Sequence, residues 1–109
     1  MSSPTTRSLA ELRKRGYQLV DIVERRKGRF ITHDCFDILD IIAIRIRWMR
    51  DVEMFGLQCT SGDNVASRVD KITNSDAIHV LRLAGWSIAV WGWRKNAKGR
   101  YVLREVELA

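Results

Sequence analysis

Apolar residues recur along this chain with two different periods, and these periods predict an α/β domain. Residues 39–46, LDIIAIRI, form a short apolar run rich in β-branched side chains, which favours a strand over a helix. After the capping residues of SGDN, Val65, Val69 and Ile72 recur at helical spacing. Strands and helices that follow one another in this way are typical of an α/β fold with a mixed sheet.

The other segments predict the element order αβββαββ, with about five strands and two main helices. Predicted helices cover residues 8–16 and 64–84, and Gly16 and Gly85 can end them. TNSD, at 73–76, interrupts or kinks the second helix. The predicted strands cover residues 17–26, 30–37, 39–46, 54–61, 86–93 and 101–108. The segment between the fourth and fifth of these strands is long enough for a right-handed crossover that joins parallel strands.

Length and composition indicate one compact domain. The chain has 109 residues, of which 46% are hydrophobic and 29% charged. Residues 1–7 are expected to form a flexible tail before the first helix, which Ser8 can cap, and residues 8–109 the domain. No apolar run reaches the length of about 18 residues that a membrane span needs, and the N-terminus lacks the apolar segment of a secretory signal. No membrane partner is therefore expected, and Cys35 and Cys59 are expected to be reduced core residues of a cytoplasmic protein.

The charge balance favours a polyanionic partner. The formal net charge is +6, and 14 of the 19 basic residues are Arg, whose planar guanidinium group matches phosphate oxygens. A basic surface that only confers solubility would show the same excess, so both interpretations stay open. Eight basic residues around two predicted turns are the expected DNA contacts, with ordinary solvated hairpin tips as the alternative. They are Arg25, Arg26, Lys27, Arg29, Arg94, Lys95, Lys98 and Arg100.

Two polar residues interrupt the apolar strands, and strand geometry can bring them together. Asp40 and Gln58 lie on two predicted strands, 18 positions apart. If these strands pair as a hairpin around RWMRD, both side chains reach the end of the sheet where the second helix begins. Thr60 shares a strand face with Gln58, so a carboxylate, a carboxamide and a hydroxyl would converge. In the alternative interpretation, Asp40 bonds to a turn at the strand end, while Thr60 and Ser61 cap the helix.

Four short motifs accompany this constellation: Asp40 in LDIIAI, QCT at 58–60, TSGDN at 60–64 and GWRK at 92–95. Together with the element order, they resemble the PD-(D/E)XK nuclease superfamily, which includes many restriction enzymes and the archaeal Holliday junction resolvases. In that family an Asp begins the second core strand and Glu-x-Lys follows on the third. Asp40 matches the Asp, and QCT stands where Glu-x-Lys would lie. The chain also looks like a group of small phage and bacterial proteins of this superfamily with a Gln-x-Thr-Ser motif, and the resemblance covers nearly its whole length.

The resemblance implies a restriction-endonuclease-like core and a metal-dependent DNA endonuclease, with branched DNA among the candidate substrates. It implies Mg²⁺ or Mn²⁺ as cofactor, because a divalent ion held by oxygen ligands neutralises a phosphate and makes water nucleophilic. Asp40 would be the anchoring ligand. Gln58 and the Cys59 carbonyl would be neutral oxygen ligands, and Asp34 could supply a second carboxylate.

The motif departs from the family at the residue that orients or deprotonates the attacking water. Thr60 stands in the place of the family's Lys and carries no charge. Lys71, or less readily Arg68, is the candidate for a relocated cation that reaches in from the helix. Solvated positions on the helix surface are the alternative for both. Glu24, beside the basic turn, is interpreted as a surface residue, with a role in the site as the alternative. The implied catalytic set is Asp40, Gln58, Thr60 and Lys71.

Two other classes of function stay open because of this departure. A catalytically inactive DNA-binding module on the same fold would keep the basic turns and need no catalytic cation. A phage assembly or adaptor protein would use the basic surface for protein contact. A homodimer is also expected, with Trp91 and Trp93 in the core or at its interface, in the cytoplasm of a bacterial or phage-infected cell.

Overall fold

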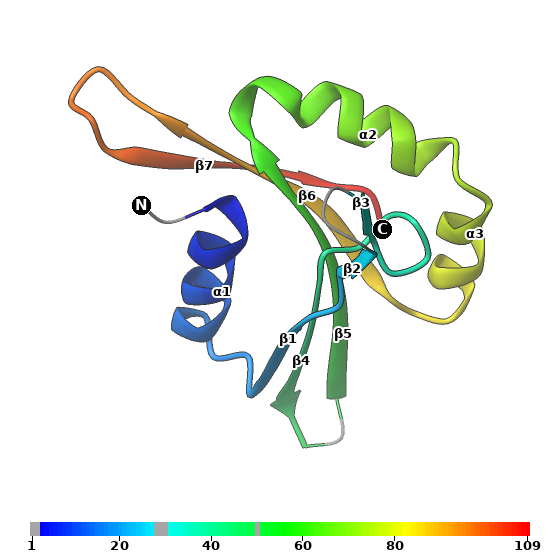
Figure 1. Cartoon of the computed structure of the whole chain (residues 1–109). Coiled ribbons are helices and arrows are strands. Elements are labelled where there is room, and N and C mark those ends of the chain that lie inside the picture. The colour runs from blue at the N-terminus through cyan, green and yellow to red at the C-terminus, as the bar shows by residue number, and fades with distance from the viewer. Residues whose placement is uncertain (1–2, 28–30, 50) are drawn as a thin grey trace.

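The computed structural model describes residues 3–27, 31–49 and 51–109 (Figure 1). The elements in chain order are α1 (Pro4–Lys14), β1 (Leu19–Ile22), β2 (Arg25–Lys27), β3 (Ile31–His33), β4 (Ile41–Trp48), β5 (Asp51–Ser61), the 3-10 turn η1 (Gly62–Asn64), α2 (Val65–Thr73), α3 (Asp76–Leu83), β6 (Ser87–Lys95) and β7 (Tyr101–Glu107). Among the described residues, no helix is long and apolar enough to cross a membrane.

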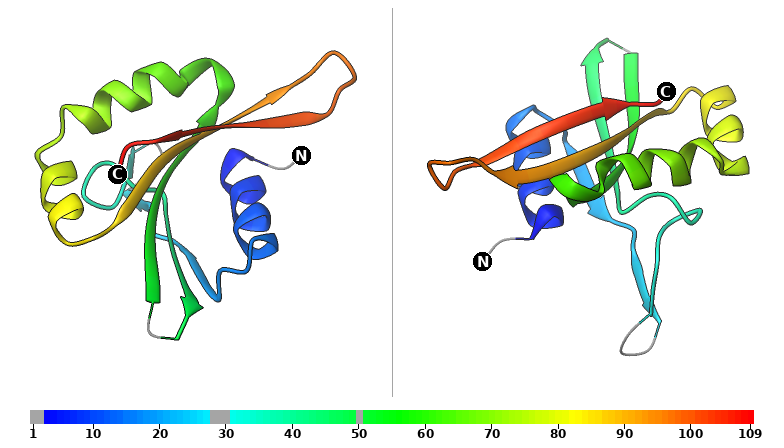
Figure 2. Two further views of the ribbon diagram at one scale, coloured as in Figure 1. Left: turned by 180° about the vertical axis from the view of Figure 1, so that it is seen from behind. Right: turned by 90° about the horizontal axis from the view of Figure 1, so that it is seen from above.

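The predicted α/β fold with a five-stranded mixed sheet is confirmed. The strand order is β1-β4-β5-β6-β7, and β5 and β6 form the parallel pair while the other neighbours are antiparallel. The strands β2 and β3 form a separate antiparallel ribbon, which projects from the main sheet in Figure 2. At the other side, β6 and β7 extend together as a two-stranded arm, here called the β6–β7 arm (Figure 1).

Helices cover both faces of the sheet, and strand periodicity decides which side chains meet which helix. One buried cluster joins Leu12 of α1 to Leu57 of β5 and Trp91 of β6. The second cluster joins Ile72 of α2 to neighbours from β6 and from the loop before β4. Because neighbouring residues of a strand point to opposite faces, Gln58 and its neighbours two residues away lie on the face that α2 covers.

The first helix begins earlier than the sequence predicts. It starts at Pro4 with Ser3 as its N-cap, whose side chain accepts a hydrogen bond from the Thr6 amide. Ser-Pro is a strong helix start, since Ser supplies an acceptor and Pro has no amide to leave unsatisfied. The flexible tail proposed for residues 1–7 is therefore wrong for residues 4–7. The predicted cap, Ser8, is fully buried instead and accepts a hydrogen bond from Trp93 Nε1 at 2.9 Å.

The predicted second helix forms two helices, so the structure has three. α2 ends at Thr73, and α3 begins after Ser75, whose side chain accepts a hydrogen bond from the Ala77 amide. Of the two residues proposed to cap the predicted second helix, Ser61 occupies the N-cap position of the preceding turn η1, and neither caps α2 itself, whose N-cap is Asn64. Thr60 lies within β5, and Ser61 makes no side-chain capping bond but accepts a hydrogen bond from Asn64 Nδ2.

The predicted strand at 17–26 is two strands with different partners. β1 pairs with β4, whereas β2 pairs with β3. The chain passes from one to the other through Val23, whose amide donates a hydrogen bond to the Asp40 carbonyl at 2.8 Å. This bond fixes the end of β1 beside the start of β4, where the polar residues singled out above are found.

Candidate metal centre

The β4–β5 hairpin brings Asp40 and Gln58 into contact, as predicted. Ile41 pairs with Leu57, and the Asp40 amide donates to the Leu57 carbonyl at 2.8 Å. Gln58 Nε2 donates to Asp40 Oδ2 at 2.7 Å, and the Cys59 amide donates to the same oxygen at 2.8 Å. Asp40 and Gln58 are only 5% and 2% exposed, so this is a buried polar contact rather than a surface one.

Two further carboxylates converge on Asp40. Glu24, between β1 and β2, and Asp34, after β3, each place a carboxylate oxygen so that the three oxygens lie within 4.8 Å of one another. We call Glu24, Asp34 and Asp40 the carboxylate triad. Asp34 thus lies near Asp40, where the sequence predicts a second carboxylate, and its role as a metal ligand stays a prediction. Glu24, interpreted as a surface residue from the sequence, supplies a third.

A strained loop holds Asp34 in place. Phe36 and Asp37 both adopt left-handed backbone conformations, with φ of 54° and 62°. Such conformations are costly for residues other than Gly, so they persist only where surrounding contacts impose them. Here the Asp37 amide donates to the Asp34 carbonyl at 2.9 Å, and Cys35 forms a β-bridge with Leu39. The loop thus folds back tightly and returns the chain to Asp40.

The triad has an unfavourable concentration of negative charge. Burial, followed by the neighbouring carboxylates of Asp34 and Glu24, raises the pKa of Asp40 to about 7, while the hydrogen bond from the Cys59 amide opposes this shift. Among the described side chains, Lys71 of α2 is the cation that contacts the triad, with its Nζ 3.2 Å from Asp34 Oδ2. The placement of Lys71 agrees with a cation that reaches in from the helix.

The triad opens into a cavity of about 540 Å³. Its lining residues come from α1, α2, β5 and the loops beside β2 and β3, and are Pro4, Thr5, Glu24, His33, Asp34, Asp37, Asp40, Gln58, Cys59, Thr60, Ser61, Arg68 and Lys71. Within the described part of the chain, Gln58 Oε1 is buried and has no hydrogen-bond partner. A buried carbonyl oxygen without a partner is costly, so this atom marks a place where a cation or a water is needed.

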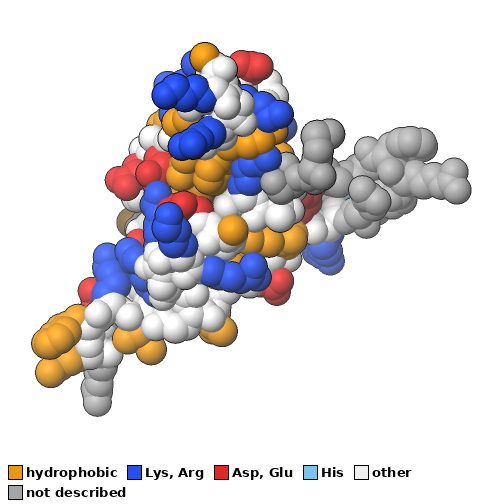
Figure 3. Space-filling model, turned by 90° about the vertical axis from the view of Figure 1, so that its left-hand side faces the viewer, with side chains coloured by type: hydrophobic (Ala, Val, Ile, Leu, Met, Phe, Trp, Pro, Cys, Tyr) orange, Lys and Arg blue, Asp and Glu red, His pale blue; other side chains and the backbone are white. Residues whose placement is uncertain are grey.

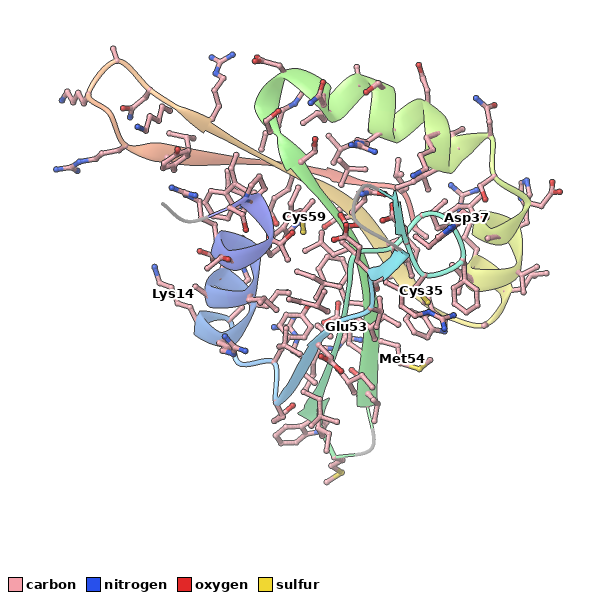
Figure 4. The ribbon with its side chains drawn as sticks, viewed as in Figure 1. Lys14, Cys35, Asp37, Glu53, Met54 and Cys59 are labelled. Carbon is pink, nitrogen blue, oxygen red and sulfur yellow. The ribbon has the colours of Figure 1, made fainter. Side chains whose placement is uncertain are left out.

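Cys59 contributes its backbone rather than its thiol. Figure 4 shows its side chain on the side of the sheet that α1 covers, away from Asp37. Burial raises the pKa of the Cys59 thiol to about 12, so the thiol stays protonated and is a poor metal ligand. The structure places the Cys59 amide on Asp40, and the role proposed for the Cys59 carbonyl stays a prediction.

The structure describes the second predicted basic cluster in full and the first only in part. Arg25 is exposed on β2, the side chains of Arg26 and Lys27 are not described, and Arg29 lies outside the described residues. The second cluster lies on the β6–β7 arm and is exposed throughout. It comprises Arg94, Lys95, Lys98 and Arg100. Figure 3 shows Lys and Arg side chains gathered on the side toward which this arm extends.

Comparison with known proteins identifies no relative of this chain. No protein family, curated protein or solved structure matches the chain. The chemistry of the site therefore has to be argued from its own residues.

Proposed function

We propose that this protein is a divalent-metal-dependent nuclease of the PD-(D/E)XK type, which hydrolyses phosphodiester bonds in DNA. The observation that carries the proposal is the carboxylate triad, whose three oxygens lie within 4.8 Å of one another beside the unpartnered Gln58 Oε1. Oxygen donors of this kind suit Mg²⁺ and Mn²⁺, and softer ions would require thiolate or imidazole ligands.

The donor set fits such an ion on physical grounds. Three carboxylates packed together repel one another, and Lys71 is the cation in contact with them. A divalent cation would relieve this repulsion and give Gln58 Oε1 a partner. The residues that would hold it are Asp40, Asp34 and Glu24 as charged ligands, with Gln58 as a neutral ligand.

A bound divalent ion supplies neutralising charge for a phosphate and lowers the pKa of a water ligand. The chain's own residues then have separate tasks. Asp40 is held in position by the amides of Gln58 and Cys59, so its free oxygen keeps a defined direction. Lys71 binds Asp34 and provides a positive charge beside the cavity, where it can orient an attacking water or stabilise charge on the phosphate.

A second function is favoured by one specific observation. Thr60, which is 5% exposed, lines the cavity where the family has a Lys, and its hydroxyl carries no charge. A DNA-binding module without catalytic activity would tolerate this replacement. Either protein would act in the cytoplasm of a bacterial or phage-infected cell, where the free thiols of Cys35 and Cys59 are suited to the reducing conditions.

Restoring the family's charged pair tests these alternatives. Gln58→Glu adds a negative ligand, and Thr60→Lys adds a cation on the same strand face. The assay is plasmid nicking and cleavage of branched DNA in Mg²⁺, with Asp40→Ala as the blank. A weakened nuclease predicts faster cleavage by the double variant than by wild type. If neither exceeds the blank while both fold and bind DNA, the inactive DNA-binding module is the correct function.

A further inference from the structure

Two of the motifs noted in the sequence lie side by side in the sheet. β5 and β6 are parallel, and their register pairs Thr60 with Gly92 and Ser61 with Trp93. TSGDN at 60–64 and GWRK at 92–95 are therefore neighbours, although the helices α2 and α3 separate them along the chain. The roles given to the carboxylate triad account for neither Gly62 nor Gly92.

These glycines line a second cavity, of about 290 Å³, next to the metal centre. A Cβ atom at Gly62 would lie 2.8 Å from the Cβ of Arg94, which also lines the cavity, so a larger residue there would displace the Arg94 side chain. A Cβ atom at Gly92 would collide with the side chain of Val65, so Gly92 allows α2 to pack closely against β6. The lining residues are Gly62, Gly92, Arg94, Lys95, Asn96, Val102 and Arg104.

The charge of this cavity is entirely positive. Three of its lining residues are cationic and none is acidic. Within the described part of the chain, the side chains of Arg94 and Arg104 have no hydrogen-bond or ion-pair partner, whereas those of Arg15, Arg45 and Arg47 are each paired with a carboxylate. Unpaired guanidinium groups beside a cavity leave their donors available to an anion.

The turn at the tip of the β6–β7 arm stabilises this arrangement. Asn96 Oδ1 accepts hydrogen bonds from the amides of Lys98 and Arg100, and the Asn96 amide donates to the Arg100 carbonyl. Gly99 supplies the left-handed residue of the turn, with φ of 76°. A turn closed by these hydrogen bonds, and by one from the Gly99 amide to the Asn96 carbonyl, holds the strands that carry Arg94 and Arg104 in a defined register, in which Gly92 pairs with Arg104.

We infer that this cavity binds a phosphate of the DNA backbone adjacent to the one that is cleaved, through Arg94 and Arg104. Ser61 lines the cavity of the carboxylate triad and Gly62 lines the basic one, so consecutive residues join the two. A strand that follows this path would place one phosphate over the triad and another between the two arginines. Binding of an anion rests on this cavity alone, and the identity of that anion as a substrate phosphate rests on the proposed function.

The direct test is titration of the ¹⁵N-labelled protein with inorganic phosphate in metal-free buffer, followed by NMR. The amide signals of Gly62 and Gly92 should shift with phosphate, and Arg94→Ala or Arg104→Ala should remove the shift. Gly62→Ala should reduce binding without a change in charge. Arg13→Ala, at the exposed end of α1 away from the arm, removes one charge elsewhere and should leave the shift intact. Absence of any shift at the glycine signals in wild type would overturn the inference.

The second measurement is duplex DNA affinity by fluorescence anisotropy over a range of salt concentrations. Each arginine variant should bind about tenfold more weakly, and its slope of log K against log salt should be shallower by about 0.9 for each phosphate that the variant no longer neutralises. Phosphate shifts in wild type, with DNA affinity unchanged in the arginine variants, would show that the cavity takes small anions only and would overturn the DNA assignment. Neither measurement needs a metal, so failure of the nuclease proposal, seen as no Mn²⁺ binding at Asp40, is recognised separately. Melting temperatures close to that of wild type establish that each variant is folded.

Discussion

The two ends of the β4–β5 hairpin both depart from the usual pattern, in which apolar side chains are buried and polar side chains are exposed. At one end Asp40, Gln58 and Thr60 are polar and at most 5% exposed. At the other end Trp48 and Met49 are apolar and 72% and 81% exposed. The same pair of strands therefore buries its polar residues and exposes its apolar ones.

The difference shows that the two ends are suited to different ligands. Burial of a polar group is costly unless it is paired, and the unpartnered Gln58 Oε1 indicates a small polar ligand. Exposed apolar side chains that lie together indicate a contact with another apolar surface. An apolar groove lined by Leu19, Val20, Asp21, Val23, Ile42 and Ile44 lies on the part of the sheet formed by β1 and β4. The homodimer predicted from the sequence would bury this groove or the exposed Trp48 and Met49.

The largest effect is expected from Asp40→Asn. Asn keeps an acceptor for the amides of Gln58 and Cys59, so the fold should persist, but the anchoring charge is lost. Affinity for Mn²⁺, measured by isothermal titration calorimetry, should fall by more than about a hundredfold, and DNA cleavage should fall to background. Asp37→Asn is the matched control, because Asp37 lines the cavity but is not in the triad. Equal Mn²⁺ affinity in wild type and Asp40→Asn would contradict the proposal that Asp40 anchors a metal ion.

A smaller effect is expected from Lys71→Ala. Loss of the cation beside the triad should lower the cleavage rate by about a hundredfold, in the range of a positioned group that handles a proton or charge. Arg68→Ala, from the same helix and the same cavity, is the control and should lower it less. Adding Thr60→Lys to the Lys71→Ala variant should partly restore cleavage, because the new lysine on β5 supplies a cation to the same cavity. Loss of Mn²⁺ affinity without a change in rate would instead make Lys71 a residue that positions Asp34.

The buried carboxyl group of Asp40 should also make the free energy of unfolding depend on pH. The pKa of Asp40 in the folded protein is raised to about 7, so between its ordinary value and about 7 the folded chain holds a proton that the unfolded chain has released. Stability without metal should therefore fall as the pH rises from about 4 to about 7, by a few kcal/mol in total, since one pKa unit corresponds to about 1.4 kcal/mol. Denaturant unfolding across this range measures the slope. It should be flatter in Asp40→Asn, and Mn²⁺ should stabilise wild type more at the higher pH.

The smallest effect on stability is expected from substitutions at the exposed apolar end of the β4–β5 hairpin. Replacing Trp48 and Met49 by Ser should change the free energy of unfolding by no more than about 0.5 kcal/mol, because neither side chain is buried. The same double variant should shift any dimer toward monomer in sedimentation at tens of micromolar protein, an order-of-magnitude range for weak interfaces. Leu83→Ser, at an exposed apolar residue of α3, is the control. Wild type that sediments only as a monomer would contradict the homodimer.

The sequence by itself determined the parts of the fold that depend on local periods. Two apolar strand segments joined by a short turn were sufficient to predict the contact between Asp40 and Gln58, because strands that follow each other so closely pair as a hairpin. Gly16 and Gly85 end their helices as predicted, with φ of 90° and 83°, since few other residues adopt this conformation. The start of α1 was missed because the prediction placed the cap at Ser8, whereas the Ser3-Pro4 pair begins the helix.

Only the tertiary structure decided which residues complete the two candidate sites. Glu24 reaches Asp40 because the chain leaves the main sheet after β1, which pairs with β4, and continues into β2, which pairs with β3; no local pattern distinguishes these partners. Arg104 joins Arg94 because β7 pairs with β6 in one particular register, and Gly62 meets them through the parallel pairing of β5 and β6. These contacts link residues far apart in the chain, and the packing of the whole sheet selects them from many pairings that local propensity leaves equally favourable.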